Sequence, residues 1–437
     1  MNRYEEKELQ QEMEQVEKYL SDYLRDPGYG GAVGNILRDM QMSKGKRLRP
    51  RLLLMASRYG DGQEPGRREK LCRLGALVEL VHMASLIHDD IVDDAPLRRG
   101  LPTTQSKYGK DMAVYAGDLI LSRIVQSLFR DGFYRVGALF GQAVESMCLG
   151  ELGQMECRGR EDITVEQYMH NIYGKTAALC RLACLAGAVE SGCSEDVQAQ
   201  LEQLGINFGY MFQIRDDLLD FVSDTEEEGK LTQMDFREGI LTLPVLYAMQ
   251  DPQAKNRIID LLREAKKGTF TGEHARTLKT IVAASGGLAD VIGALPKALN
   301  GSGCDCRVIL PLYSGIPAKF REGMEKIAEF KVWLGWRNLY CGLLKTVCGG
   351  VTFYFIDNEY YFAGPRPYGN IYQDIEKFAF FSKAVLMAEL DATPPAIANL
   401  FILYSLHASI ALSSNASTTE AWNDAAISAL LISSPFI

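Results

Sequence analysis

The stretch HMASLIHDDIVDD at residues 82–94 decides the fold class of this chain. Its apolar residues recur at intervals of three and four, which predicts a helix. On that helix Asp89 and Asp93 lie on one face, about 6 Å apart along the axis. A second stretch, RDDLLD, repeats the spacing with Asp216 and Asp220. Two such ladders inside apolar helical runs predict facing walls of a cavity for hard cations, and nearby basic residues indicate a diphosphate ligand.

The composition is that of an ordinary soluble globular protein, with 47% hydrophobic and 24% charged residues among 437. This length allows two or three domains. A formal net charge of −9 argues against broad binding to nucleic acid. The N-terminus is charged and lacks an apolar core with a cleavage site, so no signal peptide is expected. Ten scattered cysteines without a CxxC pair favour reduced thiols in a cytoplasmic protein.

The chain divides into three predicted parts. Residues 1–285 show helical periodicity, with Gly and Pro between the segments, and predict an all-α bundle of roughly ten helices. Residues 286–391 contain runs such as CRVILPLY and VTFYFI, the second preceded by the turn Gly349-Gly350, and predict an α/β piece. Residues 392–437 stay unassigned. Their uncharged beginning is long enough for a membrane span, but prolines and polar residues favour a poorly specified tail and no stable span.

Basic residues accompany the first ladder. GKRLRP places three cations within four positions, and LRRG follows the ladder closely. Arginine forks match phosphate oxygens, and lysine acts as a point charge. Each basic cluster alone would more often be a solvated surface patch, and each ladder alone could be an acidic surface face. Their proximity in the sequence favours an anion site.

Residues 1–285 resemble the all-trans polyprenyl diphosphate synthases, most of all the catalytic subunit of the heptaprenyl type. The matching motifs are GKRLRP (45–50), HMASLIHDDIVDDAPLRRG (82–100), AGDLI (116–120), GELGQM (150–155), GKTAAL (174–179), GYMFQIRDDLLDF (209–221) and EGILTLP (238–244). The resemblance implies an isoprenoid-synthase-type helical bundle. It also implies a Mg²⁺-dependent prenyltransferase that joins isopentenyl diphosphate to an allylic diphosphate and makes a long quinone side-chain precursor. The implied assembly is a homodimer, or a heterodimer with a small regulatory subunit.

The resemblance also implies roles for the residues at matching positions. The residues implied in catalysis are Asp89, Asp90, Asp93, Lys175, Asp216 and Asp217. Those implied to hold Mg²⁺ are Asp89, Asp93, Asp216 and Asp220. Those implied to bind isopentenyl diphosphate are Lys46, Arg49, His82 and Arg99, and those implied to contact the allylic substrate are Arg98, Lys175, Thr176 and Gln213. His82 lies two helical turns before Asp89 on the same face, which favours binding over the role of a satisfied core histidine.

Small side chains predict a long product. Ala84 and Ser85 lie about one turn, roughly 5 Å, below Asp89 along the expected path of the growing chain. Bulky aromatic residues at these positions accompany short products in the family. We therefore expect a product of about C30 to C40, because no large side chain closes the channel near its mouth.

The chain departs from the resemblance at several places. Ile240 stands where the family usually has Lys or Asn, and LTQMDFREG replaces a Gly-rich element after Lys230. The last helices of the bundle, expected after about residue 286, are missing. Residues 286–391 instead resemble the Rossmann-like N-terminal domain of bacterial glycogen/starch synthases. The motifs that carry this second resemblance are GGLADVIGALPKAL, VILPLYSGIP, LGWRNLYCG, YFIDNEYYF and KFAFFSKAVL.

Several alternatives to a prenyltransferase are open. A catalytically silent partner subunit is disfavoured by the two intact ladders, and a terpene cyclase by Lys46 and His82. A glycosyltransferase is disfavoured because Ala284 replaces the nucleotide-binding lysine of that family and its second domain is absent. A non-functional chimera, joined by recombination or by faulty assembly of a gene sequence, remains a further alternative, because an uncovered apolar helix face invites aggregation.

Overall fold

The computed structural model describes residues 3–43, 45–60, 66–98, 100–222, 233–285, 307–314, 321–334 and 337–363, with scattered positions from 316 to 388. Two compact units form: the first comprises Met1–Gly153 and Met169–Met211, and the second comprises Gln154–Tyr168 and Phe212–Ile437. Arg99, the turn and helix expected at 286–300, and the tail 392–437 with its possible membrane span lie outside the described residues.

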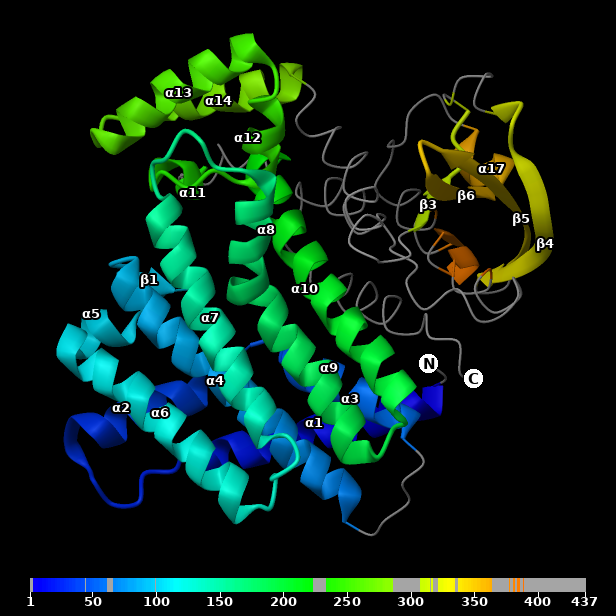
Figure 1. Ribbon diagram of the computed structural model, residues 1–437. Helices are drawn as coiled ribbons and strands as arrows, with labels where there is room; N and C mark the ends of the chain where they lie inside the picture. The colour runs from blue at the N-terminus through cyan, green and yellow to red at the C-terminus, as the bar shows by residue number, and fades with distance from the viewer. Residues whose placement is uncertain are drawn as a thin grey trace. The chain divides into compact units, whose positions relative to one another are not determined.

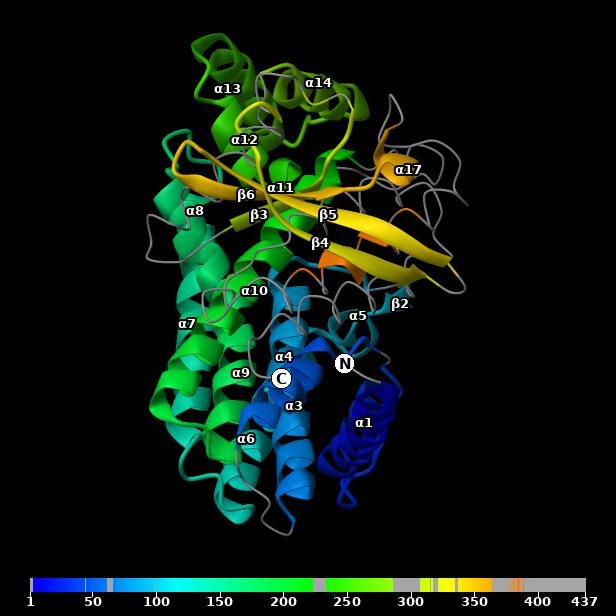
Figure 2. The same cartoon turned by 90° about the vertical axis from the view of Figure 1, so that its right-hand side faces the viewer.

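Helix α4 (Arg67–Val92) is central to the first unit (Figures 1 and 2). It packs against α1 (Arg3–Tyr23), α3 (Leu48–Ala56), α6 (Lys110–Arg130) and α9 (Ala178–Ser191). Its buried residues surround the helix axis and do not form a single stripe, as expected of a helix enclosed by others. The sequence around the first ladder is therefore apolar because it lies in the core.

The other elements before residue 285 are also helical, as predicted. They are α2 (Gly31–Met42), η1 (Ser57–Tyr59), α5 (Thr104–Tyr108), α7 (Gly137–Cys157), α8 (Val165–Ile172), the π-helical turn η2 (Tyr173–Ala177), α10 (Glu195–Val222), α11 (Met234–Arg237), α12 (Leu243–Ala248), α13 (Pro252–Lys266) and α14 (Gly272–Ala284). The exception is a two-residue antiparallel ribbon of β1 (Leu97–Arg98) and β2 (Leu101–Pro102), which the sequence analysis did not predict.

Three helical segments of the described chain are long and apolar enough to cross a membrane. They are Arg67–Val92, Lys110–Arg130 and Val165–Ser191. The rest of the protein buries 72% of the most apolar 18-residue stretch of Arg67–Val92 and 78% of that of Val165–Ser191. Core packing therefore accounts for the apolar character of these two segments, whereas only 39% of the corresponding stretch of Lys110–Arg130 is buried.

The second unit contains a four-stranded sheet in the order β3-β6-β5-β4. Its strands are β3 (Arg307–Pro311), β4 (Glu325–Leu334), β5 (Arg337–Cys348) and β6 (Val351–Asp357). β3 runs parallel to β6, and the other pairs are antiparallel. The predicted strands near 306–313 and 351–356 are confirmed, as is the turn at Gly349-Gly350, whose φ angles of 57° and 80° suit a tight hairpin. The sequence analysis did not predict β4 and β5 as strands.

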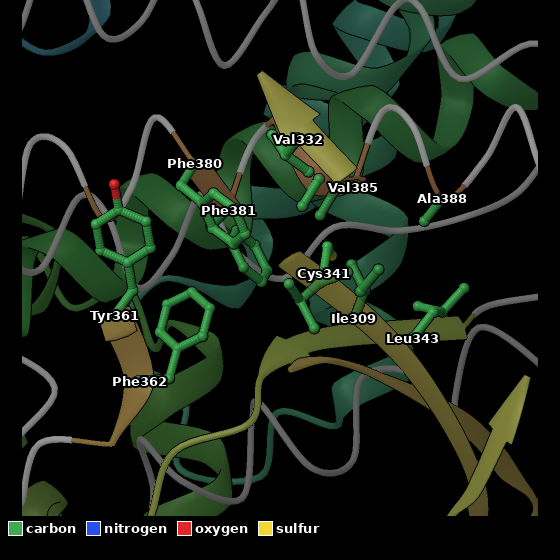
Figure 3. Packing of buried hydrophobic residues seen from close by; sticks show 12 residues of the cluster. Ile309, Val332, Cys341, Leu343, Tyr361, Phe362, Phe380, Phe381, Val385 and Ala388 are labelled. Carbon is green, nitrogen blue, oxygen red and sulfur yellow. The ribbon is translucent and has the colours of Figure 1, made fainter. Parts of the chain in front are cut away.

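One face of this sheet has its own hydrophobic core. Helix α17 (Glu359–Phe362) supplies aromatic side chains that pack on it, and further apolar side chains come from Phe380, Phe381, Ala384, Val385 and Ala388. Figure 3 shows Phe362, Phe380 and Phe381 gathered beside Tyr361. The rings of Phe362 and Phe381 meet edge-on at 6.2 Å between centroids. The segment after residue 285 therefore buries apolar surface of its own.

Candidate functional site

The first aspartate ladder lies at the C-terminal end of α4. Asp89 is half-buried, Asp90 is 5% exposed and Asp93 is exposed. The backbone N–H of Asp93 donates to the Asp89 carbonyl over 2.9 Å, so the last helical hydrogen bond joins the two carboxylate-bearing residues. Asp94 follows with a positive φ of 47° and ends the helix. The one-turn spacing of the ladder holds, although Asp93 caps the helix and does not lie inside it.

Asp90 turns inward at this helix end. Arg98 donates from Nε to Asp90 Oδ1 over 2.7 Å, and Gln105 donates from its amide to the Asp90 carbonyl over 2.6 Å. Burial raises the pKa of Asp90, and the Arg98 hydrogen bond and charge lower it. Asp90 and Arg98 thus form an ion pair that fixes the segment after α4, and their roles in catalysis and substrate binding stay predictions.

Lys175 and Thr176 lie on the π-helical turn Tyr173–Ala177. Such turns recur at functional sites because they displace side chains from the regular helical positions. The Lys175 ammonium lies 3.9 Å from Glu151 Oε1 on α7, and Thr176 is buried. The GKTAAL and GELGQM motifs therefore meet here.

Two glycines make this meeting possible. A Cβ on Gly174 would lie 2.3 Å from the Ser146 carbonyl oxygen and 2.6 Å from the Gly150 Cα. A Cβ on Gly150 would lie 2.7 Å from the Gly174 Cα. The backbones of α7 and the π-turn therefore touch, and no side chain fits between them. This contact sets the position of Lys175 relative to α7.

The electrostatics of the α4 ladder favour a bound cation. Burial and the Glu151 carboxylate raise the pKa of Asp89, Lys175 and Arg98 lower it, and the resulting pKa is about 7. A cation would relieve this penalty on the charged form. No group of three His, Cys, Asp or Glu in the described residues could hold a metal ion unaided. The oxygen donors fit Mg²⁺, which is usually held by one or two carboxylates together with water and substrate phosphates.

The second ladder lies inside α10 and has different surroundings. Asp217 is 3% exposed and accepts hydrogen bonds from the Tyr168 hydroxyl at 2.6 Å and the Gln213 amide at 2.9 Å. Burial and the Asp235 carboxylate raise the pKa of Asp217, the hydrogen bonds from Tyr168 and Gln213 lower it, and the resulting pKa is about 7. These surroundings disfavour the charged form of the inner carboxyl in the absence of a cation.

The outer residues of this ladder are more accessible. Asp216 is exposed, and Asp220 is half-buried. The backbone N–H of Gln233 donates to Asp220 Oδ1 over 3.0 Å. Burial and the Asp235 carboxylate raise the pKa of Asp220, the backbone hydrogen bond from Gln233 lowers it, and the resulting pKa is about 6. Asp216 and Asp220 thus offer the same kind of oxygen donors as Asp89 and Asp93.

The basic stretch 45–50 separates into cations of two kinds. Lys46 is exposed, and Arg49 is half-buried at the start of α3 with an Nε that has no partner in the described part of the chain. Arg47 instead turns into the protein, where it pairs with Glu17 and Glu79. The expectation of three cations at an anion site is therefore wrong for Arg47. His82, a further predicted ligand, is half-buried on α4.

Comparison with known proteins assigns the chain with these two aspartate ladders and the basic stretch 45–50 to a family. The model of the polyprenyl synthetase family matches residues 32–278, more than half of the chain. The chain belongs to the polyprenyl synthetase family. A second family model, that of the starch synthase catalytic domain, matches residues 277–397. Both resemblances inferred from the sequence are thus confirmed, and the two matches meet inside α14.

Individual polyprenyl synthetases support the assignment. The heptaprenyl diphosphate synthase component 2 of Geobacillus stearothermophilus is 36% identical over 228 residues, which span 52% of this chain and 70% of that protein. The crystal structure of a heptaprenyl diphosphate synthase from Staphylococcus aureus aligns with a TM-score of 0.60 and 27% identity, over 67% of this chain and 90% of the other.

A polyprenyl synthase from Caulobacter crescentus, crystallised with calcium and isoprenyl diphosphate, aligns with a TM-score of 0.58 and 28% identity, over 67% of this chain and 89% of the other. The curated relatives are matched over 54% to 70% of their own lengths. The reaction, the substrates and the partners of this polyprenyl synthetase are therefore treated below as proposals.

The sequence alone did not point to several residues that act on the two aspartate ladders. Tyr168 carries no motif signal, because a tyrosine 49 positions before Asp217 reveals its hydrogen bond only in the folded chain. Glu151 lies in the quoted motif GELGQM, which offered a signal that was not used. Asp235 lies in the stretch LTQMDFREG, which the sequence analysis treated only as a departure from the family.

Proposed function

We propose that this chain is a Mg²⁺-dependent prenyltransferase that condenses isopentenyl diphosphate with an allylic diphosphate into a long all-trans polyprenyl diphosphate. The observation that carries the proposal is the α4 cluster, in which Asp89 experiences the charges of Lys175 and Arg98, and Arg98 pairs with the neighbouring Asp90. Family membership supports it, as does the solved relative crystallised with calcium and isoprenyl diphosphate.

Four carboxylates are the proposed Mg²⁺ ligands. They are Asp89, Asp93, Asp216 and Asp220. Their surroundings favour bound cations, because burial raises the pKa of Asp89 and Asp220 above the ordinary aspartate value. When bound, Mg²⁺ neutralises the charge that develops on a leaving diphosphate.

The remaining site residues bind and orient the substrates. Lys175, Thr176, Gln213 and Arg98 hold the allylic diphosphate, and Lys46, Arg49, His82 and Arg99 hold isopentenyl diphosphate. The allylic C–O bond breaks, the isopentenyl double bond attacks the resulting carbocation, and a proton leaves the new chain. The buried apolar side chains of α4 keep water away from the carbocation.

A long product is part of the proposal. Ala84 is buried and Ser85 is half-buried, with its hydroxyl bonded to the His82 carbonyl at 2.9 Å. We predict that Ser85→Phe shortens the product by several isoprene units, because a ring at this level obstructs the growing chain. Chromatography of labelled products measures the length, and Ser21→Phe on the exposed face of α1 is the control. An unchanged length in active Ser85→Phe would count against this part.

We also propose that the protein works as a homodimer or with a small second subunit. Exposed apolar side chains on α6 and α7 support an assembly: Tyr115, Val125, Phe129, Leu149 and Leu152 are each more than 50% exposed. The Geobacillus relative carries the name component 2, which supports a second subunit. Light scattering of the protein and of Leu152→Asp tests this, and a monomeric wild-type protein with full activity would contradict it.

The starch synthase-like segment is proposed to transfer no sugar. It matches only residues 277–397, and its sheet has four described strands. An assay with a nucleoside-diphosphate glucose and a glucan acceptor should show no transfer. The alternative of a faulty assembly of the gene sequence predicts that the natural protein contains no peptide spanning residues 275–300, which mass spectrometry of tryptic fragments can examine.

The direct test of the prenyltransferase proposal uses purified protein with farnesyl diphosphate, labelled isopentenyl diphosphate and Mg²⁺. We expect labelled long-chain product that disappears with a chelator and returns when Mg²⁺ is restored. A folded protein that incorporates no label under these conditions, both alone and together with its small second subunit, would overturn the proposal.

A further inference from the structure

The turn before α3 contains an unusual backbone conformation. Arg47 is the N-terminal cap residue of α3 and has φ 48° and ψ 43°, in the left-handed region. Residues with a Cβ rarely adopt this region, and surrounding interactions must hold them there. Lys46 lies on one side of Arg47, and Arg49 lies in the first turn of the helix on the other. The conformation of Arg47 therefore sets the direction in which both neighbouring cations leave the turn.

A buried ion network holds Arg47 in place. Its Nε donates to Glu17 Oε1 over 2.7 Å, one terminal nitrogen donates to Glu79 Oε1 over 3.2 Å, and the other donates to the Ser43 carbonyl over 2.9 Å. The Arg47 side chain is 9% exposed and that of Glu79 is 4% exposed. Because Glu17 lies on α1 and Glu79 on α4, one guanidinium ties the turn to two helices.

The network reaches the residues expected to bind isopentenyl diphosphate. Glu79 lies one helical turn before His82 on the same side of α4. Lys46 and Arg49 flank Arg47 directly. Both carboxylates of the network pair with Arg47 and compensate its charge, whereas the neighbouring Lys46 is exposed.

We propose that Glu17 and Glu79 are positioning residues that act through Arg47 to set the turn that binds isopentenyl diphosphate. The inference rests on the proposed function, because it concerns the same substrate site. Arg47 is in this account an internal counter-charge and not a ligand. Removing one partner of a buried ion pair leaves the other charge uncompensated, so Arg47 would leave its position and the turn would relax.

Steady-state kinetics with Glu79→Gln and Glu17→Gln test the positioning role. Glu79→Gln should raise the KM for isopentenyl diphosphate about tenfold, because Lys46 and Arg49 lose their fixed directions. The KM for the allylic substrate and kcat should stay within about twofold of wild type, which a general loss of stability would not allow. Glu17→Gln should have a smaller effect, since the Glu17 side chain is 50% exposed.

A matched control lies in the same unit. Glu190 pairs with Lys70 at 2.7 Å and its side chain is 3% exposed, but it is distant from the turn in sequence and belongs to α9. Glu190→Gln removes a buried ion-pair partner of the same chemistry. It should leave the KM for isopentenyl diphosphate unchanged, even where it lowers stability.

Amide hydrogen exchange supplies a readout that needs no turnover. Glu79→Gln should accelerate exchange in residues 45–48, and Glu190→Gln should not. Folded Glu79→Gln with unchanged KM and unchanged exchange would overturn the proposal. So would Arg47→Lys raising the KM while Glu79→Gln does not, because Arg47 would then bind substrate itself. If Glu79→Gln fails to fold, Glu17→Gln decides by the same two measurements. A wild-type protein without turnover refutes the proposed function, and unchanged exchange refutes the positioning separately.

Discussion

The two aspartate ladders have the same spacing and different surroundings. On α4 the inner carboxylate, Asp90, accepts a hydrogen bond from the charged guanidinium of Arg98. On α10 the inner carboxyl, Asp217, accepts from the neutral groups of Tyr168 and Gln213. The first is compensated by a full positive charge, and the hydrogen bonds to the second in the described part of the chain come from neutral groups.

This difference shows that the DDxxD spacing determines where the carboxylates lie, whereas residues elsewhere in the chain determine their pKa values. Arg98 lies eight positions after Asp90 and is available as soon as the segment after α4 folds back. Tyr168 and Asp235 come from separate segments around α10, and Asp235 raises the pKa of Asp217. We expect Asp90 to contribute stability through its hydrogen bond and ion pair with Arg98, which offset part of the burial that raises its pKa. We expect the charge of Asp217 to lower stability.

The largest expected effect comes from displacing the π-helical turn that carries Lys175. Gly174→Val places a branched side chain where the backbone of α7 leaves no room, and should cost at least about 3 kcal/mol in the free energy of unfolding. Gly141→Val is the control on α7, because a Cβ there meets nothing within 4 Å. Urea unfolding followed by circular dichroism measures both. Equal stability of the two variants would show that the glycine contact does not matter.

The next effect tests the comparison itself. Asp90→Asn should lower the free energy of unfolding by about 1 kcal/mol at pH 7.5 without divalent ions, because the charge-assisted bond from Arg98 is weakened. Asp217→Asn should be neutral or stabilising, because it removes a buried negative charge and keeps a hydrogen-bonding oxygen. Urea unfolding of both variants beside wild type gives the two signs. A loss of similar size in both would remove the distinction between the ladders.

The smallest effect concerns the dependence of stability on pH. Burial raises the pKa of Asp217 in the folded protein to about 7, above the ordinary aspartate value of 3.8. Between these values the unfolded carboxyl loses its proton first, so the stability contributed by Asp217 is lost as pH rises from about 4 to 7. As pH rises from about 5 to 7.5, the Tm of wild type should therefore fall relative to the Tm of Asp217→Asn. The expected fall is about 2–4 °C for each kcal/mol of stability that the charge on Asp217 removes. Parallel profiles of Tm in metal-free buffer would contradict the raised pKa.

The helical class and both ladders followed from the sequence, because the 3.6-residue period and the one-turn spacing are local properties. Asp89, Asp93, Asp216 and Asp220 required no knowledge of distant residues. The fold of the later segment followed in part: β3 and β6 were predicted from β-branched runs. β4 was missed although EKIAEFKVWL alternates polar and apolar residues, the period of a half-buried strand.

The remainder depended on contacts between distant segments. The charge of Arg47 reads as part of a basic surface until Glu17 and Glu79 are seen beside it. Gly150 in GELGQM and Gly174 in GKTAAL give no sign of a mutual contact in the sequence, and the structure shows that their backbones touch. Partner identity at long sequence separation is fixed by the packing of whole helices, and no local pattern encodes it.

The most direct measurement of the central claim compares Asp89 of the first ladder with Asp94, the residue that follows this ladder, in the labelled isopentenyl diphosphate assay. Asp89 is half-buried beside Glu151 and Lys175, whereas Asp94 is exposed and pairs with Lys110 at 2.8 Å. Asp89→Asn should lower long-chain product formation at least about a hundredfold, and Asp94→Asn should change it by no more than about twofold. Equal activity of Asp89→Asn and Asp94→Asn would contradict a metal–diphosphate site at this ladder.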